Sequence, residues 1–88
     1  MPKYFFHVMN GRAIVDTVGL LLADDNEARR QALHGAGEML ADEGMSLWLG
    51  NAWVMTVTDR DGFVLSNLRI SVDQPVRAVP NGPLTVLS

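Results

Sequence analysis

The chain has 88 residues, of which 48% are hydrophobic and 19% charged, and its seven basic and ten acidic side chains give a net charge of −3. This composition is that of a folded globular domain, and the negative balance disfavours nucleic acid as a partner. The absence of cysteine excludes disulfides and zinc–thiolate sites. Without an apolar run of membrane-spanning length or a signal peptide, no membrane association is expected and the expected location is the cytoplasm.

The first predicted element is a β-hairpin over residues 3–16. Residues 3–9 are rich in aromatic and β-branched side chains and lead into Asn10-Gly11, the pair typical of a two-residue type I′ turn. Such a turn pairs His7 with Ile14, and it gives the hairpin one almost purely apolar face and one mixed face. We expect the apolar face to lie under a helix. The mixed face carries Phe5, His7, Met9, Arg12, Ile14 and Asp16.

The longest periodic segment, residues 24–43, predicts an amphipathic helix. Asp24 is the expected N-cap, and Glu27 three residues later completes a capping box. Gly44 is the expected left-handed residue after the helix, followed by a loop over residues 45–51. The apolar arc of the helix consists of Ala28, Ala32, Leu33, Ala36, Met39 and Leu40.

A second hairpin is predicted from strands over residues 52–58 and 63–72, joined by a turn at residues 59–62. In its last strand Phe63 and Leu65 are expected on the less protected face, opposite the core. The order ββαββ predicts a two-layer α+β domain, in which two β-hairpins form an antiparallel sheet and the single amphipathic helix covers one face. Whether residues 19–22 continue the first hairpin or form a strand of their own is left open.

Residues 1–73 are predicted to form this single domain, and residues 74–88 a separate tail. Pro75, Pro80 and Pro83 with Asn81-Gly82 exclude a regular helix in the tail. Its last apolar stretch, residues 84–87, has the composition of an edge strand that could pair within this chain or with a neighbour.

Several short motifs together resemble one family. They are YFFHV at residues 4–8, Asp16 and Gly19, LAD at residues 22–24 leading to EAR at residues 27–29 and Ala32, and VTD at residues 57–59 with Gly62. The set resembles a family of short uncharacterised proteins, classed as a domain of unknown function, that is common in alphaproteobacteria such as the rhizobia and often begins with a YFFH-type strand. The family pattern has proline at the position before the capping Asp24, where this chain has Ala23. The resemblance covers about residues 1–72 and implies a fold and a bacterial source, but no activity.

Candidate chemistry is sparse. His7 lies among aromatic residues, where an imidazole can stack on a base, respond to pH or bind a metal, but hydrogen bonding to a cross-strand neighbour such as Asp16 is the favoured interpretation. His34 and Glu38 make a two-ligand spacing that is better explained as an exposed charge ladder. Asp59-x-Asp61-Gly62 is interpreted as a turn. No nucleophile, acid–base or phosphate-binding pattern is present, so we expect no enzyme, no cofactor and no metal site.

One helix covers one face of a sheet, so the other face is expected to remain exposed in a single copy. We therefore expect protein–protein contacts, most directly a homodimer or another form of self-association. A different protein partner stays open, as does an antitoxin-like or nucleic-acid-associated regulator, since the order of elements is similar in layout to small antitoxin domains of the HicB type. A small-ligand or metal-binding module that uses His7 is the second alternative. The predicted interaction face consists of Phe5, His7, Met9, Ile14, Phe63 and Leu65.

Overall fold

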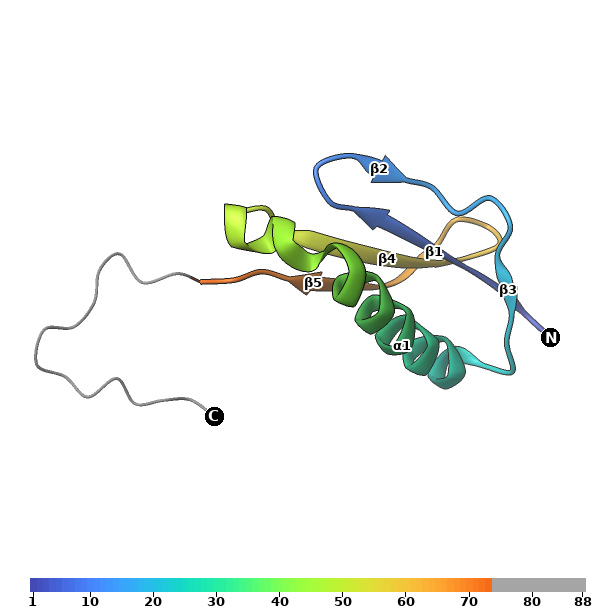
Figure 1. Cartoon of the computed structure of the whole chain (residues 1–88). Coiled ribbons are helices and arrows are strands. Elements are labelled where there is room, and N and C mark those ends of the chain that lie inside the picture. Colours follow the sequence, from blue (N-terminus) through green and yellow to red (C-terminus); the bar gives the residue numbers. More distant parts are fainter. Residues whose placement is uncertain (74–88) are drawn as a thin grey trace, which may run out of the picture.

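The structure, a computed structural model, describes residues 1–73, and the predicted tail over residues 74–88, with its possible edge strand, lies outside the described residues. The strands form one antiparallel sheet of order β2-β1-β4-β5, with β3 pairing the start of β1, and the helix lies against one face (Figure 1). The predicted α+β class with a single helix on the sheet is confirmed. In chain order the elements are β1 (Lys3–Met9), β2 (Ala13–Ile14), β3 (Leu20–Leu21), α1 (Asp25–Glu43), the 3₁₀ helix η1 (Gly44–Leu49), β4 (Trp53–Asp59) and β5 (Val64–Ile70).

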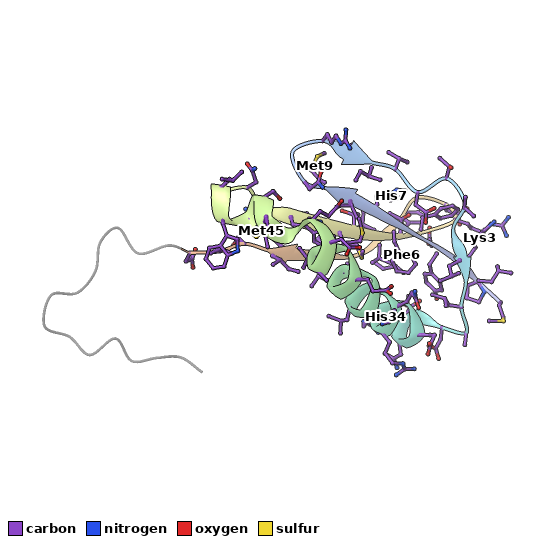
Figure 2. The ribbon with its side chains drawn as sticks, in the orientation of Figure 1. Lys3, Phe6, His7, Met9, His34 and Met45 are labelled. Carbon is purple, nitrogen blue, oxygen red and sulfur yellow. The ribbon has the colours of Figure 1, made fainter. Side chains whose placement is uncertain are left out.

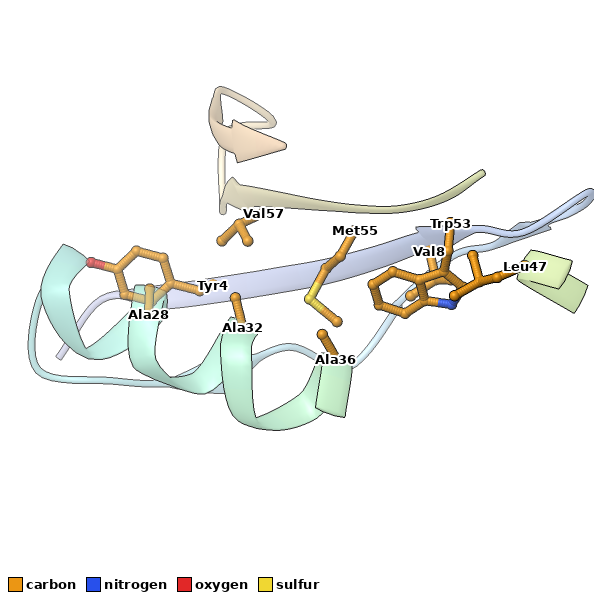
Figure 3. Packing of buried hydrophobic residues seen from close by; sticks show 9 residues of the cluster. All are labelled: Tyr4, Val8, Ala28, Ala32, Ala36, Leu47, Trp53, Met55 and Val57. Atoms are coloured by element: carbon orange, nitrogen blue, oxygen red, sulfur yellow. The ribbon is translucent and has the colours of Figure 1, made fainter. Parts of the chain in front are cut away.

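The core lies between α1 and the helix-facing rows of β1 and β4. Ala28, Ala32 and Ala36 follow one another at successive turns of α1, and all three are buried against the sheet (Figure 3). Their small side chains let the helix backbone lie close to the strands, and larger side chains from the strands fill the layer. The other members of the buried cluster are Tyr4, Val8, Leu47, Trp53, Met55 and Val57.

The predicted N-cap at Asp24 is confirmed, whereas the carboxylate of Glu27 bonds Arg30 and does not complete the predicted capping box. Oδ1 of Asp24 accepts a hydrogen bond from the backbone N–H of Glu27 at 2.9 Å, which satisfies a donor that the first helical turn leaves free. The carboxylate of Glu27 accepts a 2.8 Å hydrogen bond from Arg30 within the same helix. The N-terminal end of α1 is therefore fixed by the cap and by a surface ion pair.

The helix ends at Glu43 as predicted, but the left-handed conformation expected at Gly44 and the loop expected after it are wrong. Gly44 has an ordinary helical φ of −71°, and the chain tightens into η1 where a loop was expected over residues 45–51. The left-handed glycine that ends the helical run is Gly50, with a φ of 92°. The expected C-terminal glycine signal is present, but it acts six residues later than predicted because a 3₁₀ turn continues the helix.

The first hairpin has a three-residue loop where two residues were predicted. Val8 pairs with Ile14, which leaves residues 10–12 in the loop, and Gly11 takes the positive φ of 100° that the turn requires. A register change of one residue exchanges the two faces of a strand. Ile14 therefore lies on the helix side with Val8, and its predicted place on the exposed mixed face is wrong.

A β-bulge changes the second hairpin in a similar way. The register shifts between Val57 and Thr58, so that Thr58 pairs with Val64 and Leu65 is left as the extra residue. Leu65 lines a small cavity with Ala28 and Val57 on the helix side, so its predicted place on the opposite face is wrong. Val64, the residue before it, is 57% exposed on the other face.

Candidate interaction surfaces

The face of the sheet that α1 does not cover, here called the open face, is a three-by-three grid of cross-strand neighbours. Figure 2 shows two of its members, His7 and Met9, along β1. Of the six residues predicted for an interaction face, Phe5, His7 and Met9 belong to this grid, and Phe63 lies in the β4–β5 hairpin with 69% of its surface exposed. The rows are Met9, Val54 and Arg69, then His7, Thr56 and Asn67, then Phe5, Thr58 and Val64.

The middle row makes the open face more polar than predicted. Thr56 donates a 2.6 Å hydrogen bond from Oγ1 to Oδ1 of Asn67, and Oγ1 of Thr58 lies 3.4 Å from Nε2 of His7. The Thr56–Asn67 contact lies within the middle row, and the His7–Thr58 contact joins this row to the row of Phe5 and Val64. The open face is therefore a mixed surface, with polar side chains across its middle row.

Both ring nitrogens of His7 lie within hydrogen-bonding distance of a neighbouring group. The backbone N–H of Asp16 donates to Nδ1 at 3.1 Å, and the Phe5 ring lies parallel to the imidazole with 6.3 Å between ring centroids. Because Nδ1 accepts, the hydrogen of the neutral ring is on Nε2, where it can be donated to Thr58. The interpretation that His7 bonds to Asp16 is confirmed, although the contact is to the main chain.

Asp16 organises the connection between β2 and β3. Its carboxylate accepts from the backbone N–H of Phe6 at 3.1 Å through Oδ2, and from Val18 at 2.9 Å and Gly19 at 3.0 Å through Oδ1. Burial opposes ionisation of this carboxyl, but the donors of Gly19, Phe6 and Val18, together with His7, outweigh it and hold the pKa of Asp16 below its usual value. Sequence reasoning missed this role, for which the Asp16-x-x-Gly19 spacing was the available signal.

A second polar contact, partly buried, joins β1 to the start of α1. The hydroxyl of Tyr4 donates a 2.7 Å hydrogen bond to Oδ1 of Asp25. That bond, then burial and the negative charges of Asp25 and Asp24, raise the pKa of Tyr4 to about 12, with Arg29 acting in the opposite direction. The contact fixes the end of the helix against the sheet.

The helix packs over β4 and leaves the helix-facing side of β5 incompletely covered. Met55 of β4 is 3% exposed, whereas Leu68, its cross-strand neighbour on β5, is only half-buried. Leu33, which was predicted to belong to the buried arc, is 64% exposed. Between the two elements runs a groove of about 210 Å³, here called the α1–β5 groove. Its lining consists of Arg29, Ala32, Leu33, Ser66, Asn67 and Leu68.

Strand β5 is also an edge of the sheet. Within the described residues it pairs with β4 on one side and with no strand on the other. The outer edge therefore presents backbone N–H and C=O groups beside the α1–β5 groove, an arrangement to which another strand can add.

The remaining sequence candidates are ordinary structural features. His34 and Glu38 approach to 3.4 Å on the exposed surface of α1. Asp59 closes the β4–β5 turn, since its Oδ1 accepts from the backbone N–H groups of Asp61 and Phe63. Across residues 1–73, no group of three or more His, Cys, Asp or Glu side chains is placed to hold a metal ion. No helix in the same range has the length and apolarity needed to cross a membrane.

These features define the protein as a two-layer α+β domain with one alanine-faced helix on an antiparallel sheet. Residues 3–71 match the family model described as Domain of unknown function (DUF6894), and the chain belongs to this family. The resemblance to a domain of unknown function is confirmed at that level, and the alphaproteobacterial source stays a prediction. No curated protein matches the chain, and no solved structure matches it either.

Proposed function

We propose that this protein acts through contacts with other protein chains, first of all with a second copy of itself, in a bacterial cytoplasm and without catalysing a reaction. The support comes from the balance between its core and its surface. The buried cluster has nine members, and three of them are alanines. Against this small core, fourteen large hydrophobic side chains of residues 1–73 are exposed. Apolar surface in this proportion is typical of a chain that is stabilised by a partner.

Molar mass in solution tests the proposal. Light scattering of the full chain over a concentration series is expected to give twice the monomer mass of 9.6 kDa at the higher concentrations, falling toward the monomer mass on dilution. Because the exposed side chains are apolar, added salt is expected to leave the association largely intact. The monomer mass at every concentration would contradict self-association.

Nucleic acid is the second candidate, favoured by one observation. Phe5 and His7 lie parallel on the open face, as do aromatic side chains that stack on bases, and Arg69 adds a positive charge to the same grid. Residues 24–43 oppose it, because they carry six acidic side chains and only two arginines. Single-stranded RNA binding that weakens steeply with salt would support this candidate. A metal-binding role for His7 is weaker still, since both ring nitrogens have neighbours that can share a hydrogen bond.

A further inference from the structure

We infer that the second copy binds at the outer edge of β5, so that two β5 strands pair antiparallel about a two-fold axis. The α1–β5 grooves of both copies then face each other above the paired strands. This inference rests on the proposed self-association and names its surface. It replaces the predicted interaction face, because the structure places Ile14 and Leu65 away from the open face and a polar row across its centre.

The first support is the incomplete packing at this edge. Leu33 belongs to the apolar arc of α1, yet it is 64% exposed because the helix lies over β4 and no element covers the groove on its far side within residues 1–73. Leu68 stands across the groove and is half-buried. Two leucines that face a common groove of about 210 Å³ are an apolar surface that residues 1–73 leave unfilled.

The second support is the composition of the edge itself. Edge strands that remain unpaired usually carry charged side chains, especially lysine, or proline, and β5 has one charged side chain, Arg69, on the open face. The helix-facing row of β5 has none of these, since it consists of Ser66, Leu68 and Ile70. The bulge at Leu65 lies near the start of the strand and leaves the stretch from Ser66 to Ile70 regular.

The third support is self-complementarity. In an antiparallel pair, residues that stand opposite each other share a face, so a two-fold pairing places either a helix-facing or an open-face residue on the axis. With Leu68 on the axis, Leu68 meets its own copy on the helix side, and Asn67 meets Arg69 of the second copy on the open face. This register puts apolar side chains together in the groove and keeps the two arginines from facing each other directly. Because both copies use the same strand edge, this pairing gives a closed two-fold dimer.

The distance between the two helices of the inferred dimer explains why leucines lie above the paired β5 strands. Neighbouring strands lie about 4.8 Å apart, so the two β4 strands of such a dimer are separated by three spacings, roughly 14 Å. Packed helices stand about 8 to 10 Å apart, and helices that lie over the two β4 strands are therefore too distant for close backbone contact. Leu33 and Leu68 from both copies are long enough to fill the space above the paired β5 strands.

Disulfide trapping tests the geometry, because the natural chain has no cysteine and each variant has a single reporter thiol. Full-length Leu68→Cys, oxidised at a concentration where light scattering gives the dimer mass, is expected to form a covalent dimer on a non-reducing gel. Thr56→Cys, at the centre of the open face, is the matched control and is expected to stay largely uncrosslinked. The reverse result, with trapping at Thr56→Cys and none at Leu68→Cys, would overturn the β5 pairing and move the interface to the open face.

A pair of leucine substitutions gives an independent readout. Leu33→Glu is expected to raise the dissociation constant of the dimer tenfold or more, because a charge is placed in the closed groove. Leu49→Glu makes the same change at a leucine on η1 that is 80% exposed, against 64% for Leu33, and is expected to leave the dissociation constant within about twofold. Equal effects of the two substitutions would contradict the inference. A wild-type chain that is monomeric throughout would instead contradict the proposed self-association as a whole.

Discussion

The hydroxyl of Tyr4 donates a 2.7 Å hydrogen bond to Oδ1 of Asp25, and this contact joins the first strand to the first turn of the helix, 21 residues later in the chain. It raises the pKa of Tyr4 to about 12, whereas an unfolded chain has the ordinary value of 10.0. The protonated hydroxyl is thus favoured by folding. Its contribution to stability is complete below pH 10 and is lost as the pH rises toward 12.

Tyr4→Phe removes this contribution. The variant is expected to be less stable than the wild type at pH 7, and the difference is expected to shrink between pH 10 and pH 12, where the wild type loses the hydrogen bond. Denaturant unfolding followed by circular dichroism at a series of pH values measures both effects. If the difference in stability between the two proteins stays constant up to pH 12, the hydrogen bond to Asp25 is not what raises the pKa of Tyr4.

The carboxylate of Asp16 is expected to set the acid sensitivity of the fold. Asp16→Ala leaves the N–H groups of Phe6, Val18 and Gly19 without their acceptor and is expected to lower the free energy of unfolding by about 2 kcal/mol. Because folding lowers the pKa of Asp16, the stabilisation is present above the unfolded value near 3.8 and is lost as the pH falls below it. The wild type and Asp16→Ala are therefore expected to converge in stability at acid pH. A difference that persists at pH 2 would contradict this account.

The tautomer of His7 is fixed by its neighbours. Since the backbone N–H of Asp16 donates to Nδ1, the neutral ring is expected to carry its hydrogen on Nε2. Long-range ¹H–¹⁵N correlation spectra distinguish the two ring nitrogens directly. Thr58→Val, which removes the hydroxyl near Nε2, is the control and is expected to leave the tautomer unchanged. A hydrogen found on Nδ1 in the neutral ring would show that the Asp16 contact is absent in solution.

Gly19 is required for two separate reasons, and a second glycine separates them. Its φ is 75°, and an added Cβ would lie 2.9 Å from Cε2 of Phe5. Gly62 has a similar φ of 87° with open space around it, so Gly62→Ala measures the backbone strain alone, about 1 to 2 kcal/mol. Gly19→Ala is expected to cost more than Gly62→Ala, because the Phe5 ring must also move. Equal losses in unfolding experiments would show that the Phe5 contact imposes no constraint.

Much of the fold could be predicted because its signals are local. The alternation of residues 3–9, the cap at Asp24 and the alanine spacing of the helix each reflect a few neighbouring residues, and each is confirmed. The registers could not be predicted, because they depend on contacts across strands. The observed register of the first hairpin places Asp16 beside Phe6, where its carboxylate accepts the backbone N–H, whereas the Asn10-Gly11 pair alone favoured a two-residue turn.

The candidate surface was less accessible to sequence reasoning than the fold. Helical periodicity assigned Leu33 to the buried arc, but periodicity does not say over which strands a helix lies. Because α1 lies over β4, Leu33 faces a groove beside β5 and stays exposed. Likewise, the bulge that moves Leu65 to the helix side has no local sequence signature here. The position of α1 over β4 and the bulge at Leu65 therefore determine which apolar side chains remain exposed.

Backbone hydrogen exchange at two protein concentrations tests the β5 pairing most directly. The N–H groups of β5 that point away from β4 have no strand partner within residues 1–73 and become hydrogen-bonded in the inferred dimer. Their exchange is expected to slow as the concentration rises through the dissociation constant, while the amides of β2, the strand at the opposite end of the sheet order, keep the same rate. A doubled molar mass with no added protection in β5 would contradict the inferred interface.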